Sequence, residues 1–244
     1  MESKKYKLTA ETKEVGGVTL HRIECVTAFC NVECGAKGGW IESYYNLSQE
    51  DDAWVGENAK VDGNAWVGGN ATVRGNAKVG ENAWVGGKAT VGGDATVGGD
   101  ATVRENATVG GKAWVVGNAT VRGNAKVDGK ATVGGNAWVV GDATVGENAT
   151  VDGNAWVGGN ATVRGNADYI VFKNWWSSGR YFTWTRSNNK WKVGCFFGSG
   201  EELIAKAYKD SEKSGREYER VVKYVNDILK EEDNDNGNRN KCEG

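Results

Sequence analysis

The stretch Ala65-Trp66-Val67-Gly68-Gly69-Asn70 is one copy of a six-residue unit that repeats without a break from Ala53 to Ala167. Nineteen valines, Val55 to Val163, fall six residues apart, and each follows an alanine by two positions. A fixed short period is typical of a solenoid, in which each unit stacks on its neighbours. Nearly half of the 244-residue chain therefore belongs to one repeat region.

Within each unit, the alanine and the valine should point to the same side of an extended segment, because they are two positions apart. The residue between them is Trp, Thr or Lys, and it should point to the opposite side. β-Branched valine favours strands, whereas the Gly- and Asn-rich positions after it favour turns. Each unit is predicted to be a short strand followed by a corner, with Ala and Val inside.

The repeat resembles that of the hexapeptide-repeat family of left-handed parallel β-helices. The segment Val67-Gly68-Gly69-Asn70-Ala71-Thr72 fits every position of the family pattern, which starts with an aliphatic residue and has a small residue in fifth place. The resemblance implies a triangular prism with three units in each 18-residue coil. We expect an all-β solenoid, a left-handed parallel β-helix of about six coils, over residues 53–168, followed by a small C-terminal α+β domain.

An 18-residue coil would sort the outward residues into three faces. One face would carry Trp66, Trp84, Thr102, Thr120, Trp138 and Trp156. The second would carry Trp54, Thr72, Thr90, Thr108, Lys126, Thr144 and Thr162, and the third Lys60, Lys78, Thr96, Trp114, Thr132 and Thr150. One corner would stack Asn64, Asn82, Asp100, Asn118, Asn136 and Asn154 as a side-chain amide ladder.

The face with four tryptophans is the candidate binding surface of the solenoid. Exposed indoles could contact a protein partner or a second copy of the chain, or could form a platform for a small ligand. Tryptophan and threonine are also good strand residues, so the same pattern fits a solvated sheet without a ligand. We predict Trp66, Trp84, Trp138 and Trp156 as partner-binding residues.

Catalytic residues are not predicted. Many hexapeptide-repeat proteins are acyltransferases that use a histidine base, and some are carbonic anhydrases that hold zinc with three histidines. His21 is the only histidine of this chain, and no insertion interrupts the repeat. General base catalysis by histidine is therefore impossible in residues 53–244. We expect a non-enzymatic protein without a cofactor.

Residues 1–52 are predicted to cap the solenoid with irregular units. Val18–Ile23 is expected to be a strand, and Cys30–Val32 and Ala36–Gly38 are interpreted as degraded units. His21, Cys25, Cys30 and Cys34 could supply four zinc ligands, but no Cys-x-x-Cys pair is present. We favour buried core cysteines, and we predict no metal.

Two segments outside the repeat resemble parts of phage proteins. Gly38–Ser43, followed by Asn46-Leu47-Ser48, resembles the lead-in of phage and bacterial hexapeptide-repeat proteins. Trp191–Gly198 and Glu217-Tyr218 resemble C-terminal regions found with such repeats in phage and prophage proteins. The resemblance implies a phage-encoded protein, and no catalytic assignment comes with it.

Residues 169–230 are predicted to form the α+β module. Tyr169–Lys173, Arg180–Arg186 and Lys190–Phe196 read as three strands. A helix should follow Ser199, which can cap it together with Glu202, and a second helix should run from about Gly215 to Lys230. Residues 231–244 are polar, and we expect them to be disordered.

The module also holds the second candidate site. Ten of the 29 residues from Tyr169 to Phe197 are aromatic, and basic residues lie among them. Such a mixture can stack on bases and contact phosphates, although a small sheet also needs aromatic side chains for its core. We predict Trp175, Trp176, Arg180 and Tyr181 as ligand-binding residues, with Trp175, Trp176 and Arg180 exposed near a turn.

The composition of the chain indicates which classes of partner and which cellular compartment to expect. Thirty basic residues face 32 acidic ones, so no net charge steers the chain toward nucleic acid. We expect no membrane association and a cytoplasmic location, because no apolar span or secretory signal is visible and five cysteines fit a reducing compartment. The leading function is a scaffold that engages a protein partner, with homo-oligomerisation possible. The alternative is a module that binds a nucleotide, an oligonucleotide or a glycan and so traps a ligand or inhibits a host system.

Overall fold

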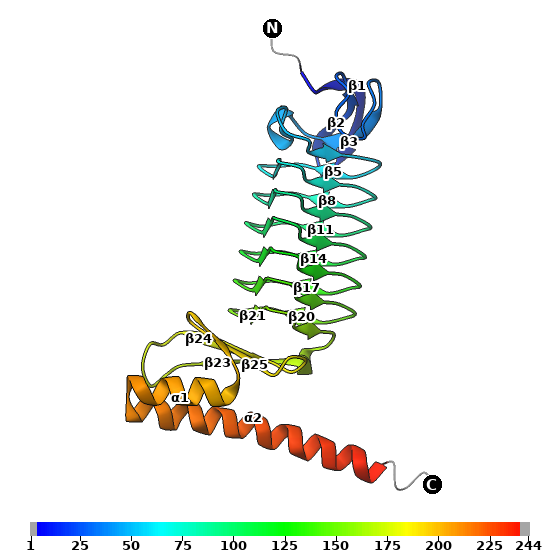
Figure 1. The fold of residues 1–244 in the computed structure, drawn as a ribbon. Helices are drawn as coiled ribbons and strands as arrows, with labels where there is room; N and C mark the ends of the chain where they lie inside the picture. Colours follow the sequence, from blue (N-terminus) through cyan, green and yellow to red (C-terminus); the bar gives the residue numbers. More distant parts are fainter. Residues whose placement is uncertain (1–3, 240–244) are drawn as a thin grey trace. The chain divides into compact units, whose positions relative to one another are not determined.

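The structure is a computed structural model that describes residues 4–239 (Figure 1). The chain divides into two compact units. Residues 1–170 and 185–188 belong to the first unit, and residues 171–184 with those from 189 onward belong to the second. The first unit contains the repeat, and the second contains two helices and most of a small antiparallel sheet.

The repeat forms nineteen two-residue strands in three parallel sheets. The first sheet stacks β4 (Trp54–Val55), β7 (Thr72–Val73), β10 (Thr90–Val91), β13 (Thr108–Val109), β16 (Lys126–Val127), β19 (Thr144–Val145) and β22 (Thr162–Val163). The second stacks β6 (Trp66–Val67), β9 (Trp84–Val85), β12 (Thr102–Val103), β15 (Thr120–Val121), β18 (Trp138–Val139) and β21 (Trp156–Val157). The third contains β5 (Lys60–Val61), β8 (Lys78–Val79), β11 (Thr96–Val97), β14 (Trp114–Val115), β17 (Thr132–Val133) and β20 (Thr150–Val151).

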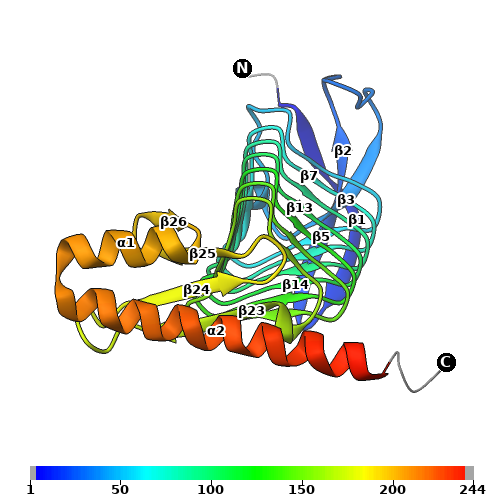
Figure 2. The ribbon, with the colours of Figure 1, turned by 60° about the horizontal axis from the view of Figure 1, so that its bottom comes forward.

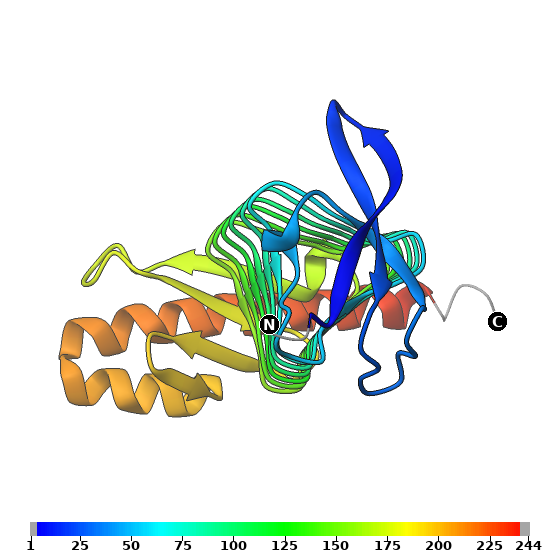
Figure 3. The same ribbon diagram turned by 90° about the horizontal axis from the view of Figure 1, so that it is seen from above.

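The predicted fold class is confirmed, and the three predicted faces correspond to the three sheets. Trp66 pairs with Trp84 and Val67 with Val85, which is a register of 18 residues, and the same shift recurs along each sheet. The alanines and valines of the repeat are buried throughout. The coils superimpose closely when the solenoid is viewed along its axis (Figure 3). Stacking buries the Val side chains that a single coil would leave exposed.

Four corners of the solenoid place a glutamate, instead of glycine, in the left-handed backbone region. The Glu57 carboxylate accepts a hydrogen bond from the Gly75 N–H at 2.8 Å, and Glu105 accepts from the Gly123 N–H at 2.8 Å. A left-handed conformation costs a non-glycine residue roughly 1–2 kcal/mol. The charge-assisted hydrogen bond to the next coil offsets part of that cost.

The N-terminal segment adds a turn to the solenoid. An antiparallel hairpin of β1 (Tyr6–Val15) and β2 (Val18–Cys25) continues into β3 (Lys37–Ile41) and the 3-10 helix η1 (Tyr44–Asn46). Strand β3 pairs with β5 in parallel, with Trp40 opposite Lys60. The solenoid therefore has about seven turns, one more than predicted, because residues 37–48 follow the same path without matching the repeat.

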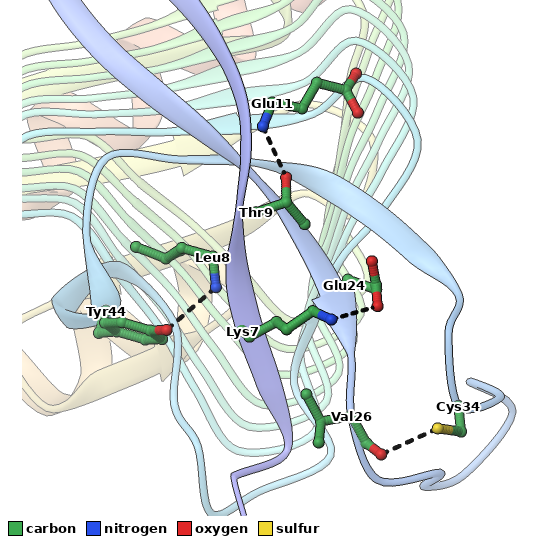
Figure 4. A network of polar contacts seen from close by, with 8 residues as sticks. All are labelled: Lys7, Leu8, Thr9, Glu11, Glu24, Val26, Cys34 and Tyr44. Carbon is green, nitrogen blue, oxygen red and sulfur yellow. Dashed lines mark hydrogen bonds and ion pairs between the residues drawn. The ribbon is translucent and has the colours of Figure 1, made fainter.

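The expected Val18–Ile23 strand is confirmed, but the interpretation of Cys30–Val32 as a degraded unit is wrong. Phe29 and Val32 form an isolated antiparallel bridge in a loop, so this segment turns back on itself. Polar contacts tie the hairpin together (Figure 4). The Lys7 ammonium lies 2.7 Å from Glu24, and the Leu8 N–H donates to the Tyr44 hydroxyl at 3.2 Å.

The first turn of the solenoid presents backbone carbonyl groups, and buried side-chain donors satisfy several of them. The Lys5 ammonium, in a residue that is only 6% exposed, donates to the carbonyls of Asp51 at 2.5 Å and Ala53 at 2.8 Å. The amide of fully buried Asn46 donates to the carbonyls of Gly63 at 3.0 Å and Ala65 at 2.9 Å. Backbone hydrogen bonds of the stack run from the N–H of one coil to the carbonyl of the next, which explains why this end needs donors.

The last turn presents backbone N–H groups, and side-chain acceptors bind several of them. The Asp168 carboxylate, which follows β22 in the 3-10 helix η2 (Asn166–Asp168), accepts from the N–H groups of Arg164 at 2.7 Å and Gly165 at 3.0 Å. The Ser187 hydroxyl accepts from the Thr162 N–H at 2.6 Å. Both ends of the stack are thus closed with chemistry that matches the direction of the backbone hydrogen bonds.

The C-terminal sheet has four strands, so the prediction of three is wrong. The order is β23 (Tyr169–Lys173), β24 (Tyr181–Thr185), β25 (Lys190–Val193) and β26 (Phe196–Gly198). The predicted third strand splits because Gly194 adopts a positive φ of 54° and turns the chain. Trp191 then pairs with Gly198 across the new hairpin.

Two helices follow the sheet and fold back on each other (Figure 2). Helix α1 (Gly200–Asp210) begins with the predicted capping box of Ser199 and Glu202, and α2 spans Glu212–Arg239. Helix α2 therefore continues to Arg239, beyond the predicted end near Lys230 and into the tail that was expected to be disordered. Residues 240–244 lie outside the described part of the chain.

Candidate functional site

The six-stranded sheet carries two outward ranks of side chains, which together we name the tryptophan–arginine face. The first rank is Trp66, Trp84, Thr102, Thr120, Trp138 and Trp156. The second rank lies immediately after each strand, two residues beyond the first rank, and consists of Gly68, Gly86, Arg104, Arg122, Val140 and Gly158. Two pairs of tryptophans therefore flank a central pair of arginines. The tryptophan positions were predicted, whereas the arginines were missed, although their recurrence in adjacent coils is visible in the sequence.

The four tryptophans of this face are not equally exposed. A Cβ atom at Gly68 would lie only 1.9 Å from the Trp66 ring, which shows that this indole lies across the glycine. Trp156 covers Gly158 in the same way. Trp84 and Trp138 are more exposed, at 44% and 39%. Glycine in the second rank therefore allows an indole to lie flat on the coil.

Three aromatic rings surround a hollow at the N-terminal end of the face. Tyr45, Trp66 and Trp84 line it together with Asn64 and Asn82, and its volume is about 460 Å³. The ring centroids of Trp66 and Trp84 are 6.1 Å apart at an angle of 52°. Tyr45 was not predicted, because it lies in the segment before the regular repeat.

The arginines in the middle of the face are held by a neighbouring carboxylate and by an indole. Arg122 lies 3.6 Å from the Glu105 carboxylate, and Arg104 lies 3.9 Å from it. The Arg122 guanidinium also lies 5.5 Å from the centroid of the Trp138 ring, at cation–π distance. These contacts position the two cations, although the buried Nε of each guanidinium makes no hydrogen bond within the protein.

The predicted amide ladder is present at the corner beside this face. Asn64 donates to Asn82 at 3.0 Å, and Asn82 donates to Asp100 at 2.8 Å. A second run starts again at Asn118, which donates to Asn136 at 3.0 Å. An ionised aspartate accepts hydrogen bonds but cannot donate one, so Asp100 ends the first run.

The predicted aromatic site of the C-terminal unit is only partly exposed. Trp175 is 72% exposed, and Arg180 and Tyr181 are exposed as well. The prediction that Trp176 is exposed is wrong, because it is 9% exposed and its ring packs edge-on against Tyr218 with centroids 5.0 Å apart. The neighbouring indoles of Trp175 and Trp176 are perpendicular to each other, and only that of Trp176 packs in the core.

Arg180 and Tyr181 also line a polar hollow of about 230 Å³ that was not predicted. Asn174 and Tyr218 lie in its wall, and the Asn174 amide donates to the Tyr218 hydroxyl at 2.9 Å. Burial, and then the negative charge of Asp210, raise the pKa of Tyr218, which keeps this hydroxyl neutral. Asp210, at the end of α1, lines the same hollow.

The residues considered as zinc ligands do not form a metal site. Cys25 is buried, and its thiol lies 3.2 Å from the Thr27 carbonyl. Cys30 and Cys34 are exposed, so the prediction of core cysteines is confirmed only for Cys25. Within residues 4–239, no group of three or more His, Cys, Asp or Glu side chains could hold a metal ion.

One carboxylate at a corner of the solenoid, that of Asp62, has a raised pKa. Burial raises the pKa of Asp62, and the negative charges of Glu42 and Glu81 raise it further. Glu42 and Glu81 each accept a hydrogen bond from a backbone N–H, of Gly63 and Gly99 respectively. Two of these three carboxylates therefore hold the corner of a coil together, which is a structural role.

No protein-family model matches the chain, and no curated protein matches its sequence. Within residues 4–239, no helix is long and apolar enough to cross a membrane.

Proposed function

We propose that this protein is a non-enzymatic scaffold whose tryptophan–arginine face binds a protein partner. The observation that carries the proposal is the arrangement of exposed Trp84 and Trp138 on either side of Arg104 and Arg122 on one flat sheet. Tryptophan and arginine are enriched in the residues that dominate binding energy at protein interfaces. The face spans six coils, or roughly 24 Å at the usual strand spacing of about 4.8 Å.

Rigidity supports the same role. Each coil is bonded to its neighbours through parallel backbone ladders, and the arginines are already held by Glu105 and Trp138. Little side-chain ordering would then oppose binding, and ordering costs about 0.5–1.5 kcal/mol for each immobilised flexible side chain. A second copy of the chain is the simplest alternative partner, since the face is flat and continuous.

Origin and compartment are part of the proposal. The uninterrupted six-residue period supports membership of the hexapeptide-repeat family, and the lead-in at Gly38–Ser43 supports its phage-encoded members. The absence of histidine from residues 53–244 supports a non-enzymatic role. The free cysteines of the described residues support a reducing cytoplasm.

The test replaces Trp84 and Trp138 together by threonine, the residue that other coils carry at this rank. Trp114→Thr is the matched control, because Trp114 is exposed on a different sheet. The first step identifies proteins that the wild type and the control capture from a host extract and the double variant does not. Each captured protein is then purified, and its affinity for the wild type, the control and the double variant is measured by titration. We expect the double variant to weaken binding at least about a hundredfold, as for two hot-spot residues.

Light scattering of the same three proteins tests self-association. If a dimer forms through this face, the double variant should be monomeric while Trp114→Thr stays dimeric. If the double variant and the wild type capture the same proteins and have the same mass in solution, the face is not the binding surface.

A further inference from the structure

The polar hollow of the C-terminal unit lies beside the loop between β23 and β24 and near the junction of α1 and α2. Its volume is about 230 Å³, which is large enough to hold several water molecules. A free amino acid or another small molecule of that size fits this space, whereas a folded partner does not. Polar residues dominate the wall, and Tyr181 contributes an exposed ring.

Opposite charges line this hollow without neutralising each other. Arg180 comes from the loop before β24, and Asp210 comes from the last residue of α1. Both are exposed, and in the described part of the chain neither side chain has an ion-pair partner. A cation and an anion in the wall of one small hollow are complementary to a ligand that carries both charges.

A buried acceptor lies in the same wall. Asn174 is 6% exposed, and its Nδ2 donates to the Tyr218 hydroxyl. Its Oδ1 is buried and has no hydrogen-bond partner in the protein. Leaving a buried polar atom unpaired costs about 1–3 kcal/mol, so this oxygen favours a species in the hollow that can donate a hydrogen bond.

The loop that carries Arg180 is held in place by its own backbone. The Asn174 N–H donates to the Arg180 carbonyl at 2.8 Å, and the Gly179 N–H donates to the Asn174 carbonyl at 2.7 Å. Gly179 has a φ of 67°, which glycine adopts without strain. The hydrogen bonds close the loop around Ser177 and Ser178, so the cation and the buried amide are presented together before any ligand arrives.

We propose that this hollow binds a zwitterion of amino-acid size, with its carboxylate at Arg180 and its ammonium group at Asp210. Asn174 Oδ1, which has no hydrogen-bond partner within the protein, gains one if a donor on the ligand approaches it. The site is separate from the tryptophan–arginine face, so the proposal goes beyond the scaffold function and does not depend on it. A nucleotide is a poorer fit, because its phosphates would be repelled by Asp210.

Isothermal titration of the full-length protein with each standard free amino acid tests this assignment. We expect at least one to bind, and its N-acetyl and carboxamide derivatives to bind at least about tenfold more weakly, because each lacks one charge. Arg180→Gln and Asp210→Asn should each weaken binding by about tenfold or more. Arg220→Gln and Asp227→Asn, which change exposed charges of α2 outside the hollow, should leave it unchanged.

Three results would overturn the proposal. The first is that no free amino acid binds at millimolar concentration. The second is that the uncharged derivatives bind as well as the zwitterion, or that Arg180→Gln and Asp210→Asn bind as the wild type does. The third is that a nucleoside monophosphate binds in preference, with an affinity that depends on Arg180 but not on Asp210. All four variants change exposed residues, so a circular dichroism spectrum like that of the wild type is expected for each.

Discussion

The two ends of the solenoid are closed by opposite chemistry. At the first turn, buried Lys5 and Asn46 donate to backbone carbonyls of the stack, whereas at the last turn Asp168 and Ser187 accept from N–H groups. The difference follows from the single direction of the backbone hydrogen bonds in a parallel stack. The two ends also differ in burial, because Lys5 and Asn46 are buried whereas Asp168 is half-buried and Ser187 is exposed. Water can replace an exposed acceptor, but it cannot easily replace a buried donor.

The largest expected effect is therefore at Asn46. Asn46→Ala should lower the free energy of unfolding by about 3 kcal/mol, because the carbonyls of Gly63 and Ala65 and the Ser43 N–H lose their partner. Asn64→Ala is the matched control, since Asn64 is exposed and makes one ladder bond, and it should cost less than about 1 kcal/mol. Chemical denaturation measures both. If both variants lose the same free energy of unfolding, burial does not explain the contribution of Asn46 to stability.

The next largest effect is a dependence of the free energy of unfolding on pH, which we expect from Lys5 at the first turn. Burial lowers the pKa of Lys5 from 10.5 to about 8. Between these values the unfolded chain binds a proton that the folded chain has lost, so stability rises as pH rises, and the gain is absent below about pH 8. The contribution should reach about 2 kcal/mol between pH 7 and 10.

Lys5→Met provides the comparison for this measurement, because it retains much of the side-chain volume and removes the titrating group. Denaturant midpoints of the two proteins should be compared at several pH values up to 10, and tyrosines and cysteines that ionise in this range are common to both proteins and cancel in the comparison. The wild type should become more stable relative to Lys5→Met as pH rises. Parallel curves would mean that Lys5 is not the source of the dependence.

The smallest effect is expected at the acceptor end. Asp168→Ala should lower stability by about 1 kcal/mol, because water can bind the Arg164 and Gly165 N–H groups that the carboxylate leaves. Asp168→Asn should lose less stability than Asp168→Ala, since the amide oxygen of asparagine can still accept hydrogen bonds from these N–H groups. Asp128→Ala, which removes a carboxylate bonded only to the adjacent Gly129 N–H, serves as the control. A loss at Asp168 as large as that at Asn46 would contradict the proposed difference between the ends.

Periodic features were predictable from sequence, and unique contacts were not. The positions of Trp66, Trp84, Trp138 and Trp156 on one sheet followed from the 18-residue register alone, because every coil repeats the same path. Trp176 illustrates the opposite case. Its burial depends on Tyr218, which lies 42 residues later in the sequence and belongs to α2. No pattern around Trp175 and Trp176 distinguishes the indole that enters the core from the one that does not.

The sequence by itself determined the solenoid, its three faces and its amide ladder, because each depends on a local unit that repeats and on strand geometry that alternates inward and outward positions. Only the tertiary structure decided how the ends are closed and where the polar hollow lies. The contacts between Lys5 and Ala53 and between Asn174 and Tyr218 each join residues more than forty positions apart, and each occurs once. Contacts without a period leave no trace in composition or spacing, and their geometry exists only after the chain has folded.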